Sequence, residues 1–199
     1  MSILLPSSVV LGVILGATIM PASILPMLQP LIMIFLYLLL CCIGINLTAE
    51  ANILKLIKDI HPLALLLIPL SACGSIIGAA FVTGFGGESP WLGAAIGAGF
   101  GWYSLAGVLL SESLGPASGA LAFLTNTFRE LLALAFLPLA IKHLGQAGFV
   151  LGGATTMDTT LAIISKAGGS EMTCIALLHG IMLSTLVPIL VPILATFVP

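Results

Sequence analysis

Apolar residues fill long stretches of the chain, separated by short segments that contain polar residues, glycine or proline. A helix needs about 20 apolar residues to cross a hydrocarbon layer about 30 Å thick. The pattern therefore predicts about seven spans, at about 3–25, 27–45, 62–85, 90–111, 117–141, 147–166 and 172–197. Residues 48–60 instead carry isoleucine and leucine on one helical face and lysines elsewhere, which predicts a short interfacial helix.

The composition indicates the same class of protein. Hydrophobic residues make up 60% of the 199 residues and charged residues only 6%, and the mean hydropathy is +1.29. These values are typical of an all-α polytopic membrane protein and exclude an ordinary soluble domain. We expect a single membrane domain over residues 1–199, in the lipid bilayer of the inner (cytoplasmic) membrane.

The polar residues also exclude several partners. The 5 basic and 7 acidic side chains are scattered along the chain, so no basic stripe is available for nucleic acid. The four cysteines lie in apolar runs without the spacing of metal ligands. We expect neither a metal site nor a cofactor.

Glycines mark the places where helices should approach closely or unwind. Pairs at small-xxx-small spacing, such as Gly74/Gly78 and Gly93/Gly97, predict close packing of helix backbones. In residues 97–104 and 152–160, glycines adjoin polar residues instead. Non-helical backbone at membrane depth is tolerated only where it is buried in protein or lines a water-filled cavity. We therefore predict unwound helix centres, and a binding site, around Gly99, Gly101, Gly152 and Gly153.

Two carboxylates lie inside predicted spans, Glu130 and Asp158. A charge at the centre of a bilayer costs about 2.5–3.5 kcal/mol even on lenient insertion scales, so such groups usually face a bundle interior or an ion pathway. Asn126 shares a helical face with Glu130, whereas Arg129 points about 100° away. We expect all three charges to meet in one interior with a net charge of −1, which favours a cation or a proton on one carboxyl. The alternative is a structural pair between Arg129 and one carboxylate, with the other protonated.

Hydroxyl groups near Asp158 are further candidates. Thr155, Asp158 and Thr159 are spaced i, i+3 and i+4, so a continuous helix would place a carboxylate between two hydroxyls on one face, with Thr156 beside them. The alternative is that these threonines bond back to their own helix.

Three consecutive residues and one histidine complete the candidate site. Trp102, Tyr103 and Ser104 lie in the middle of a predicted span, where they either form the wall of a cavity that holds a cation or simply pack. His179 either relays protons and contacts substrate, or bonds a hydroxyl or carbonyl of a neighbouring helix.

The chain resembles the LysO lysine exporters in the order and spacing of several motifs. The motifs are Gly99-Phe-Gly-Trp-Tyr-Ser-Leu-Ala-Gly107, Leu114-Gly-Pro116, Phe128-Arg-Glu-Leu131, Gly153-Ala-Thr-Thr-Met-Asp-Thr-Thr-Leu161 and His179-Gly180. The resemblance implies a secondary transporter that exports L-lysine or a similar cationic amino acid in exchange for H⁺ (or Na⁺). It also implies an architecture like that of cation/proton antiporters, with crossed, broken helices, and it maps the membrane acidic residues of the family onto Glu130 and Asp158.

A lysine pose follows from the resemblance and the charge count. The two ammonium groups of lysine would contact Asp158 and Glu130, and Arg129 would hold its carboxylate. Departures from the family pattern put the substrate in question: Ala162 stands where proline is frequent, and Thr125-Asn126-Thr127 replaces an asparagine-aspartate pair.

Other readings of the chain remain open. Full-length exporters of this type carry further N-terminal helices, so the chain resembles their C-terminal two-thirds. A homodimer or a small membrane partner subunit would fill the gap. A cation/proton antiporter with another substrate is a further alternative. An enzyme is not expected, because the chain lacks paired catalytic aspartates, a His-Glu-x-x-His zinc motif and a Gly-x-Ser-Gly nucleophile.

Overall fold

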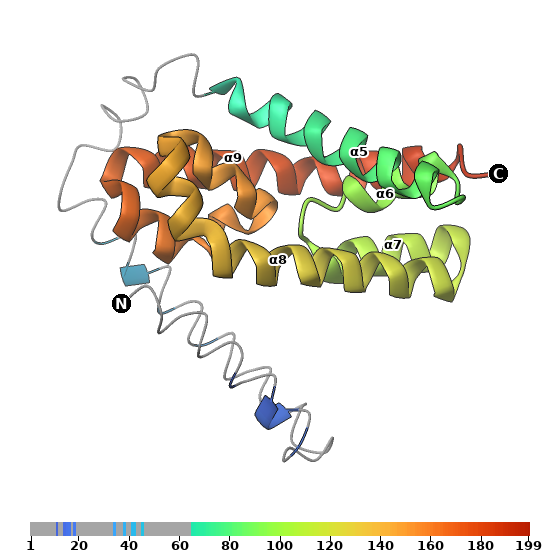
Figure 1. The fold of residues 1–199 in the computed structure, drawn as a ribbon, viewed down its shortest axis with the longest axis horizontal. Coiled ribbons are helices and arrows are strands. Elements are labelled where there is room, and N and C mark those ends of the chain that lie inside the picture. Colours follow the sequence, from blue (N-terminus) through green and yellow to red (C-terminus); the bar gives the residue numbers. More distant parts are fainter. Residues whose placement is uncertain are drawn as a thin grey trace.

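The computed structural model describes residues 65–199 continuously, together with isolated helical positions between residues 11 and 45. The predicted interfacial helix at 48–60 and most of the first two predicted spans lie outside the described residues. Residues 65–199 form helices without any strand (Figure 1). In chain order they are α5 (Leu67–Phe85), α6 (Pro90–Gly97), α7 (Tyr103–Leu114), α8 (Pro116–Leu144), the 3-10 helix η2 (Gly145–Met157) and α9 (Leu161–Ala195).

Three helical stretches among the described residues are long and apolar enough to cross a membrane. They are Leu67–Phe85, Pro116–Met157 and Leu161–Ala195. The all-α membrane class is thereby confirmed for this part of the chain, whereas the count of seven spans stays a prediction. The predicted break between residues 166 and 172 coincides with Gly169, where the backbone within α9 is non-helical (φ 71°, ψ −169°).

Two helices are interrupted where the glycine pattern predicted it. Within the predicted span 90–111, α6 ends at Gly97 and α7 begins at Tyr103. Within the predicted span 147–166, the 3-10 helix η2 ends at Met157 and α9 begins at Leu161, with non-helical backbone at Gly153 and Asp158. The unwound centres are therefore confirmed.

The two interruptions contact each other. The backbone N–H of Ala154 donates to the carbonyl of Phe100 at 2.8 Å, which joins one interruption directly to the other. Gly153 has φ 62°, and a Cβ there would collide with the Phe100 carbonyl oxygen. Only glycine permits both the backbone conformation and the close approach. We use the term crossing for residues 98–102 and 152–160 together.

Apolar side chains form two separate clusters on either side of a polar layer. One cluster contains Leu137 and Phe149 with Ile164 and Ile175 of α9. The other contains Phe100, Leu110 and Ala122 with Leu183 and Val187 of α9. Between the two clusters lie the polar residues of α8 from Asn126 to Glu130 and His179 of α9. The crossing is thus set at the depth where the apolar core is interrupted.

Neighbouring helices pair closely around this layer. α7 packs against α8, and α5 packs against α6, with α9 beside both pairs (Figure 1). Gly97 lets α6 approach α5, because a Cβ there would lie 2.6 Å from the carbonyl oxygen of Ser75 and 2.8 Å from Cβ of Ala79. The predicted packing role of the Gly93/Gly97 pair is confirmed. Gly74 and Gly78 meet no described atom within 4 Å.

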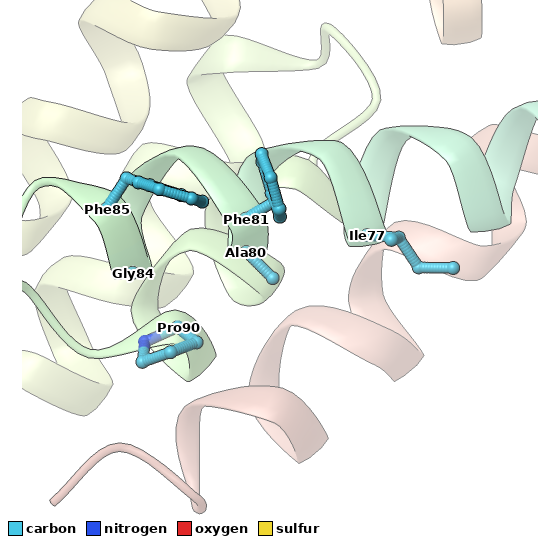
Figure 2. Close-up of a pocket in the computed structure, with 6 residues that line it drawn as sticks. All are labelled: Ile77, Ala80, Phe81, Gly84, Phe85 and Pro90. Atoms are coloured by element: carbon cyan, nitrogen blue, oxygen red, sulfur yellow. The ribbon is translucent and has the colours of Figure 1, made fainter.

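An apolar depression of about 460 Å³ lies at the C-terminal end of α5 (Figure 2). Phe81 and Phe85, whose ring centroids are 4.6 Å apart, line it together with Pro90. It offers no charged side chain, and we assign no chemistry to it.

Alanine at Gly93 should separate α5 from α6. The added methyl would collide with the Thr83 side chain and the Ala79 carbonyl, so we expect Gly93→Ala to lower the free energy of unfolding by about 1–3 kcal/mol. Reversible unfolding in detergent micelles measures this change. Gly78→Ala is the matched control, because it adds the same methyl in open space and should gain up to about 1 kcal/mol from helix propensity. Equal losses in both variants would contradict the packing role.

Candidate functional site

Glu130 and Asp158 meet at Thr159. The Thr159 hydroxyl donates to Oε1 of Glu130 at 2.7 Å, and the backbone N–H of Thr159 donates to Oδ1 of Asp158 at 2.5 Å. The same hydroxyl oxygen lies 3.4 Å from Oδ1 of Asp158. Both carboxylates are half-buried and repel one another electrostatically. One residue of the crossing therefore holds two like charges close together.

Helix α9 helps to hold the negative charge. Asp158 lies two residues before Thr160, the N-cap of α9. The N-terminus of a helix carries unpaired N–H groups and a partial positive charge, which stabilises a nearby carboxylate. Tyr103, at the start of α7, lies within the electrostatic field of both carboxylates. A proton or a cation bound here would relieve the repulsion between Glu130 and Asp158.

Arg129 lies on the other side of α8. Its Nη1 donates to the Ser75 hydroxyl at 2.5 Å, and that hydroxyl donates to the carbonyl of Gly97 at 2.7 Å. Because Gly97 is the last residue of α6, the guanidinium is close to the negative end of that helix dipole. In residues 65–199, no ion pair joins Arg129 to Glu130 or Asp158.

The structural pair between Arg129 and a carboxylate, which was the alternative, is therefore not seen among residues 65–199. The expectation that all three charges share one interior stays a prediction. Consecutive helical residues point about 100° apart. Arg129 consequently contacts Ser75 of α5 and lies beside Gly153, whereas Glu130 contacts Thr159 just before α9.

A groove of about 960 Å³ opens on the Arg129 side. Its lining comes from α5, α6, α8 and η2 and is mostly apolar. The polar residues in its wall include Arg129, Asn126, Ser71 and Ser75, whereas Glu130 and Asp158 do not line it. The groove thus presents one cation beside hydroxyl groups within an apolar surface.

Asn126 holds the interruption between α6 and α7. Its Oδ1 accepts the backbone N–H of Gly101 at 2.8 Å. Its Nδ2 donates to the carbonyls of Ile96 at 3.1 Å and Ala122 at 3.0 Å. The side chain is only 2% exposed, and all its polar atoms are engaged with backbone. Asn126 therefore replaces the helical hydrogen bonds that the interruption removes.

The predicted glycines all lie at the crossing. A Cβ at Gly99 would lie 2.7 Å from Nδ2 of Asn126, and one at Gly152 would lie 2.7 Å from Oγ1 of Thr160. Gly101 has φ 99°, and Gly153 lies beside Nη2 of Arg129. The four positions leave room for backbone and polar side chains where two helices meet.

Threonines stabilise the second interruption. Thr155 donates to the carbonyl of Gly152 at 2.9 Å, Thr156 donates to that of Gly153 at 2.8 Å, and Thr160 donates to that of Thr155 at 2.9 Å. The expected helical face with Thr155, Asp158 and Thr159 is absent, because residues 158–160 are not helical. The alternative that threonines bond to nearby backbone holds for Thr155 and Thr156.

The remaining candidates divide into exposed and buried residues. Trp102 is 37% exposed, and Ser104 is exposed as well. Tyr103 packs edge-on against Phe123 with ring centroids 5.3 Å apart. His179 is fully buried, with Nε2 2.8 Å from the Ser71 hydroxyl and Nδ1 3.0 Å from the Thr156 hydroxyl. It bonds hydroxyls of neighbouring segments, as one of the two sequence alternatives stated.

Comparison with known proteins identifies the family. The family described as "Lysine exporter LysO" matches residues 7–195. The chain belongs to the LysO lysine exporter family.

Two curated proteins align with part of the chain. The Escherichia coli K12 protein "Lysine exporter LysO" is 46% identical over 97 residues, which are 49% of this chain and 32% of that protein. A Haemophilus influenzae protein described as "Putative lysine exporter" is 41% identical over 105 residues, which are 53% of this chain and 54% of that protein. The chain thus spans about a third and about half of the two relatives it matches. No solved structure matches it.

Sequence reasoning on this LysO family member missed Ser71, Ser75 and Thr160. The available signal was the i, i+4 spacing of Ser71 and Ser75, which places two hydroxyls on one face of an otherwise apolar helix. A half-buried arginine without a carboxylate partner, such as Arg129, needs such acceptors.

Removing the amide of Asn126 should destabilise the crossing. Asn126→Leu keeps a similar volume but leaves the Gly101 N–H without its partner, whereas the Ile96 carbonyl keeps the Gly99 N–H at 3.1 Å. We therefore expect a loss of about 1–3 kcal/mol in the free energy of unfolding. Unfolding in detergent micelles measures it. Thr127→Val is the control on the same helix, because the exposed Thr127 hydroxyl bonds only its own helix at Phe123, and it should cost less than about 0.5 kcal/mol. A loss as small as that of the control would contradict the role of Asn126.

Proposed function

We propose that the chain is a transport domain that exports L-lysine or a similar cationic amino acid in exchange for protons. The observation that carries this proposal is the pair of carboxylates, Glu130 and Asp158, held by one hydroxyl at the crossing of two interrupted helices. The names of the family and of both relatives support lysine as the exported amino acid.

The carboxylate pair supports coupling to a cation. The hydroxyl of Thr159 has one hydrogen and donates it to Glu130, so it cannot screen Asp158 at the same time. A proton, Na⁺ or an ammonium group would neutralise the remaining charge. If the substrate and the proton occupy the same carboxylate pair in turn, the pair cannot carry both at once. Exchange of one for the other requires this.

The crossed interruptions support a cation/proton antiporter-like architecture. Helices broken at membrane depth expose backbone groups and helix ends to bound ions. Here the α9 N-terminus lies at Asp158, and the α6 C-terminus lies at Arg129 through Ser75. Each helix end carries the partial charge opposite to that of its neighbouring side chain, so the site holds both signs of charge without an ion pair.

Arg129 supports recognition of a substrate carboxylate. Its guanidinium has five N–H donors, and among the described residues only the Ser75 hydroxyl accepts from it. It lines the groove of about 960 Å³, whose apolar wall suits an aliphatic chain. We assign the substrate carboxylate to Arg129 and the positive charge of the substrate or the exchanged proton to the carboxylate pair.

Neutralising either carboxylate should abolish exchange. In proteoliposomes we expect lysine-dependent proton flux to fall at least about tenfold in Asp158→Asn and in Glu130→Gln, because each removes a charge-assisted contact. Glu112→Gln is the control, since Glu112 is exposed on α7 outside the crossing, and it should keep the wild-type flux. Undiminished flux in both test variants would exclude these carboxylates from the pathway.

Two further results of this assay would revise the proposal. Flux that requires a second, small membrane subunit would assign the function to a split transporter. Proton flux driven by another cation, with none driven by lysine, would identify an antiporter with a different substrate.

Substrates with and without a carboxylate test Arg129. 1,5-Diaminopentane is lysine without its carboxylate, so Arg129→Gln should raise the KM for lysine at least about tenfold, as expected for a lost charged contact, and leave competition by the diamine unchanged. Arg129→Lys, which keeps the charge but loses the planar fork, should fall between wild type and Arg129→Gln. Equal weakening of both compounds by Arg129→Gln would show that Arg129 acts only on the fold.

A further inference from the structure

His179 connects three segments that are distant in the sequence. Its Nε2 contacts Ser71 of α5, its Nδ1 contacts Thr156 of the crossing, and the residue itself belongs to α9. Its ring is fully buried, with Phe149 edge-on at 5.2 Å between centroids. It is the polar residue of α9 between the two apolar clusters.

The hydrogen bonds around this ring cannot all form at once with a neutral imidazole. Ser71 also contacts the Ile68 carbonyl as donor at 2.9 Å, and Thr156 contacts the Gly153 carbonyl as donor at 2.8 Å. Each hydroxyl has one hydrogen, and a neutral imidazole has one N–H and one lone pair. One hydroxyl must therefore donate to the ring and release its carbonyl.

The ring is neutral in this environment, because a fully buried imidazolium would need a carboxylate partner and none of the described residues provides one at either nitrogen. Two tautomers are then available. With the proton on Nε2, Thr156 must turn its hydrogen to Nδ1 and release Gly153. With the proton on Nδ1, Ser71 turns its hydrogen to Nε2 and releases Ile68.

The two released carbonyls differ in what remains to satisfy them. Ile68 lies in the first turn of α5, where its carbonyl keeps the helical hydrogen bond of the residue four positions later. Gly153 lies at the non-helical point of the crossing, so its carbonyl relies on the Thr156 hydroxyl, which donates to it at 2.8 Å, and not on a regular helical hydrogen bond. The Nδ1–H tautomer is thus the one that keeps every group at the crossing bonded.

We propose that His179 is a positioning residue for the carboxylate site, and that as the Nδ1–H tautomer it secures Thr156 and the Gly153 carbonyl and so sets the place of Asp158. Few residues separate the His179 ring from the Asp158 carboxylate. Thr156 is two residues from Asp158, and Gly180, next to His179, packs so closely on Met157 that a Cβ there would lie 2.5 Å from its backbone nitrogen. The transport consequence rests on the proposed function, whereas the tautomer does not.

The tautomer can be read from the ring nitrogens. We would label the histidines of the full chain with ¹⁵N, reconstitute it in lipid nanodiscs and record the ring spectra at neutral pH. The chain has 3 histidines, and the signals that vanish in His179→Asn belong to His179. The expected result is a protonated Nδ1 and a bare Nε2. Protonation of Nε2 alone, or of both nitrogens, would overturn the proposal.

Isosteric variants test the positioning role in the same proteoliposome assay. The amide nitrogen of asparagine can replace Nδ1, and that of glutamine can replace Nε2. We expect His179→Asn to keep lysine flux within about threefold of wild type and His179→Gln to lose at least about tenfold, as for a lost buried hydrogen bond. Among the partners, Thr156→Val should lower flux more than Ser71→Ala, and Thr156→Ser should restore it.

The reverse order in either pair would overturn the positioning role, since a residue that only filled space would not distinguish the two amides. Absence of lysine flux in the wild-type chain would instead count against the proposed function. In that case the ¹⁵N spectra alone decide the tautomer. The positioning role is then tested by stability, and His179→Asn should lower the free energy of unfolding less than His179→Gln does.

Discussion

Interrupting a helix inside an apolar layer leaves backbone N–H and C=O groups without partners, and the protein must satisfy them internally. This requirement explains most of the polar residues at the crossing. Asn126 bonds the backbone on both sides of the first interruption, and threonines bond it within the second. In addition, the Ala154 N–H of the second interruption donates to the Phe100 carbonyl of the first. The site can contain non-helical backbone because these bonds replace those of the helix.

Satisfying the backbone also separates the charges. Arg129 reaches the carbonyl end of α6 through Ser75, whereas Asp158 lies at the amino end of α9. Each charge is stabilised by a helix end of opposite sign, so the arginine and the carboxylates remain available to ligands instead of neutralising one another. In the proposed exchange a direct ion pair would be difficult to break, since a buried pair that loses one partner leaves an uncompensated charge.

Several features of the site followed from the sequence. Glycines beside polar residues predicted both interruptions, because no other residue combines positive φ with close backbone approach. Glu130 and Asp158 were identified from the cost of a charge in an apolar span. The bonds of Asn126 to the backbone were not predicted, and those of Thr155 and Thr156 were one of two alternatives, because an amide or hydroxyl that bonds backbone and one that bonds substrate look the same in a sequence. Ser71 and Ser75 were missed because their partners, His179 and Arg129, are distant along the chain.

The sequence by itself determined the helical membrane class, the places where helices break and the presence of buried charges, since these depend on local composition and on the apolar environment. The tertiary structure decided which groups meet. It turned Arg129 away from Glu130, brought Thr159 between the two carboxylates and placed His179 between Ser71 and Thr156. These contacts depend on how α5, α8 and α9 pack around the crossing, and the physical reason is that packing rotates each helix as a whole, so no local pattern specifies its partners.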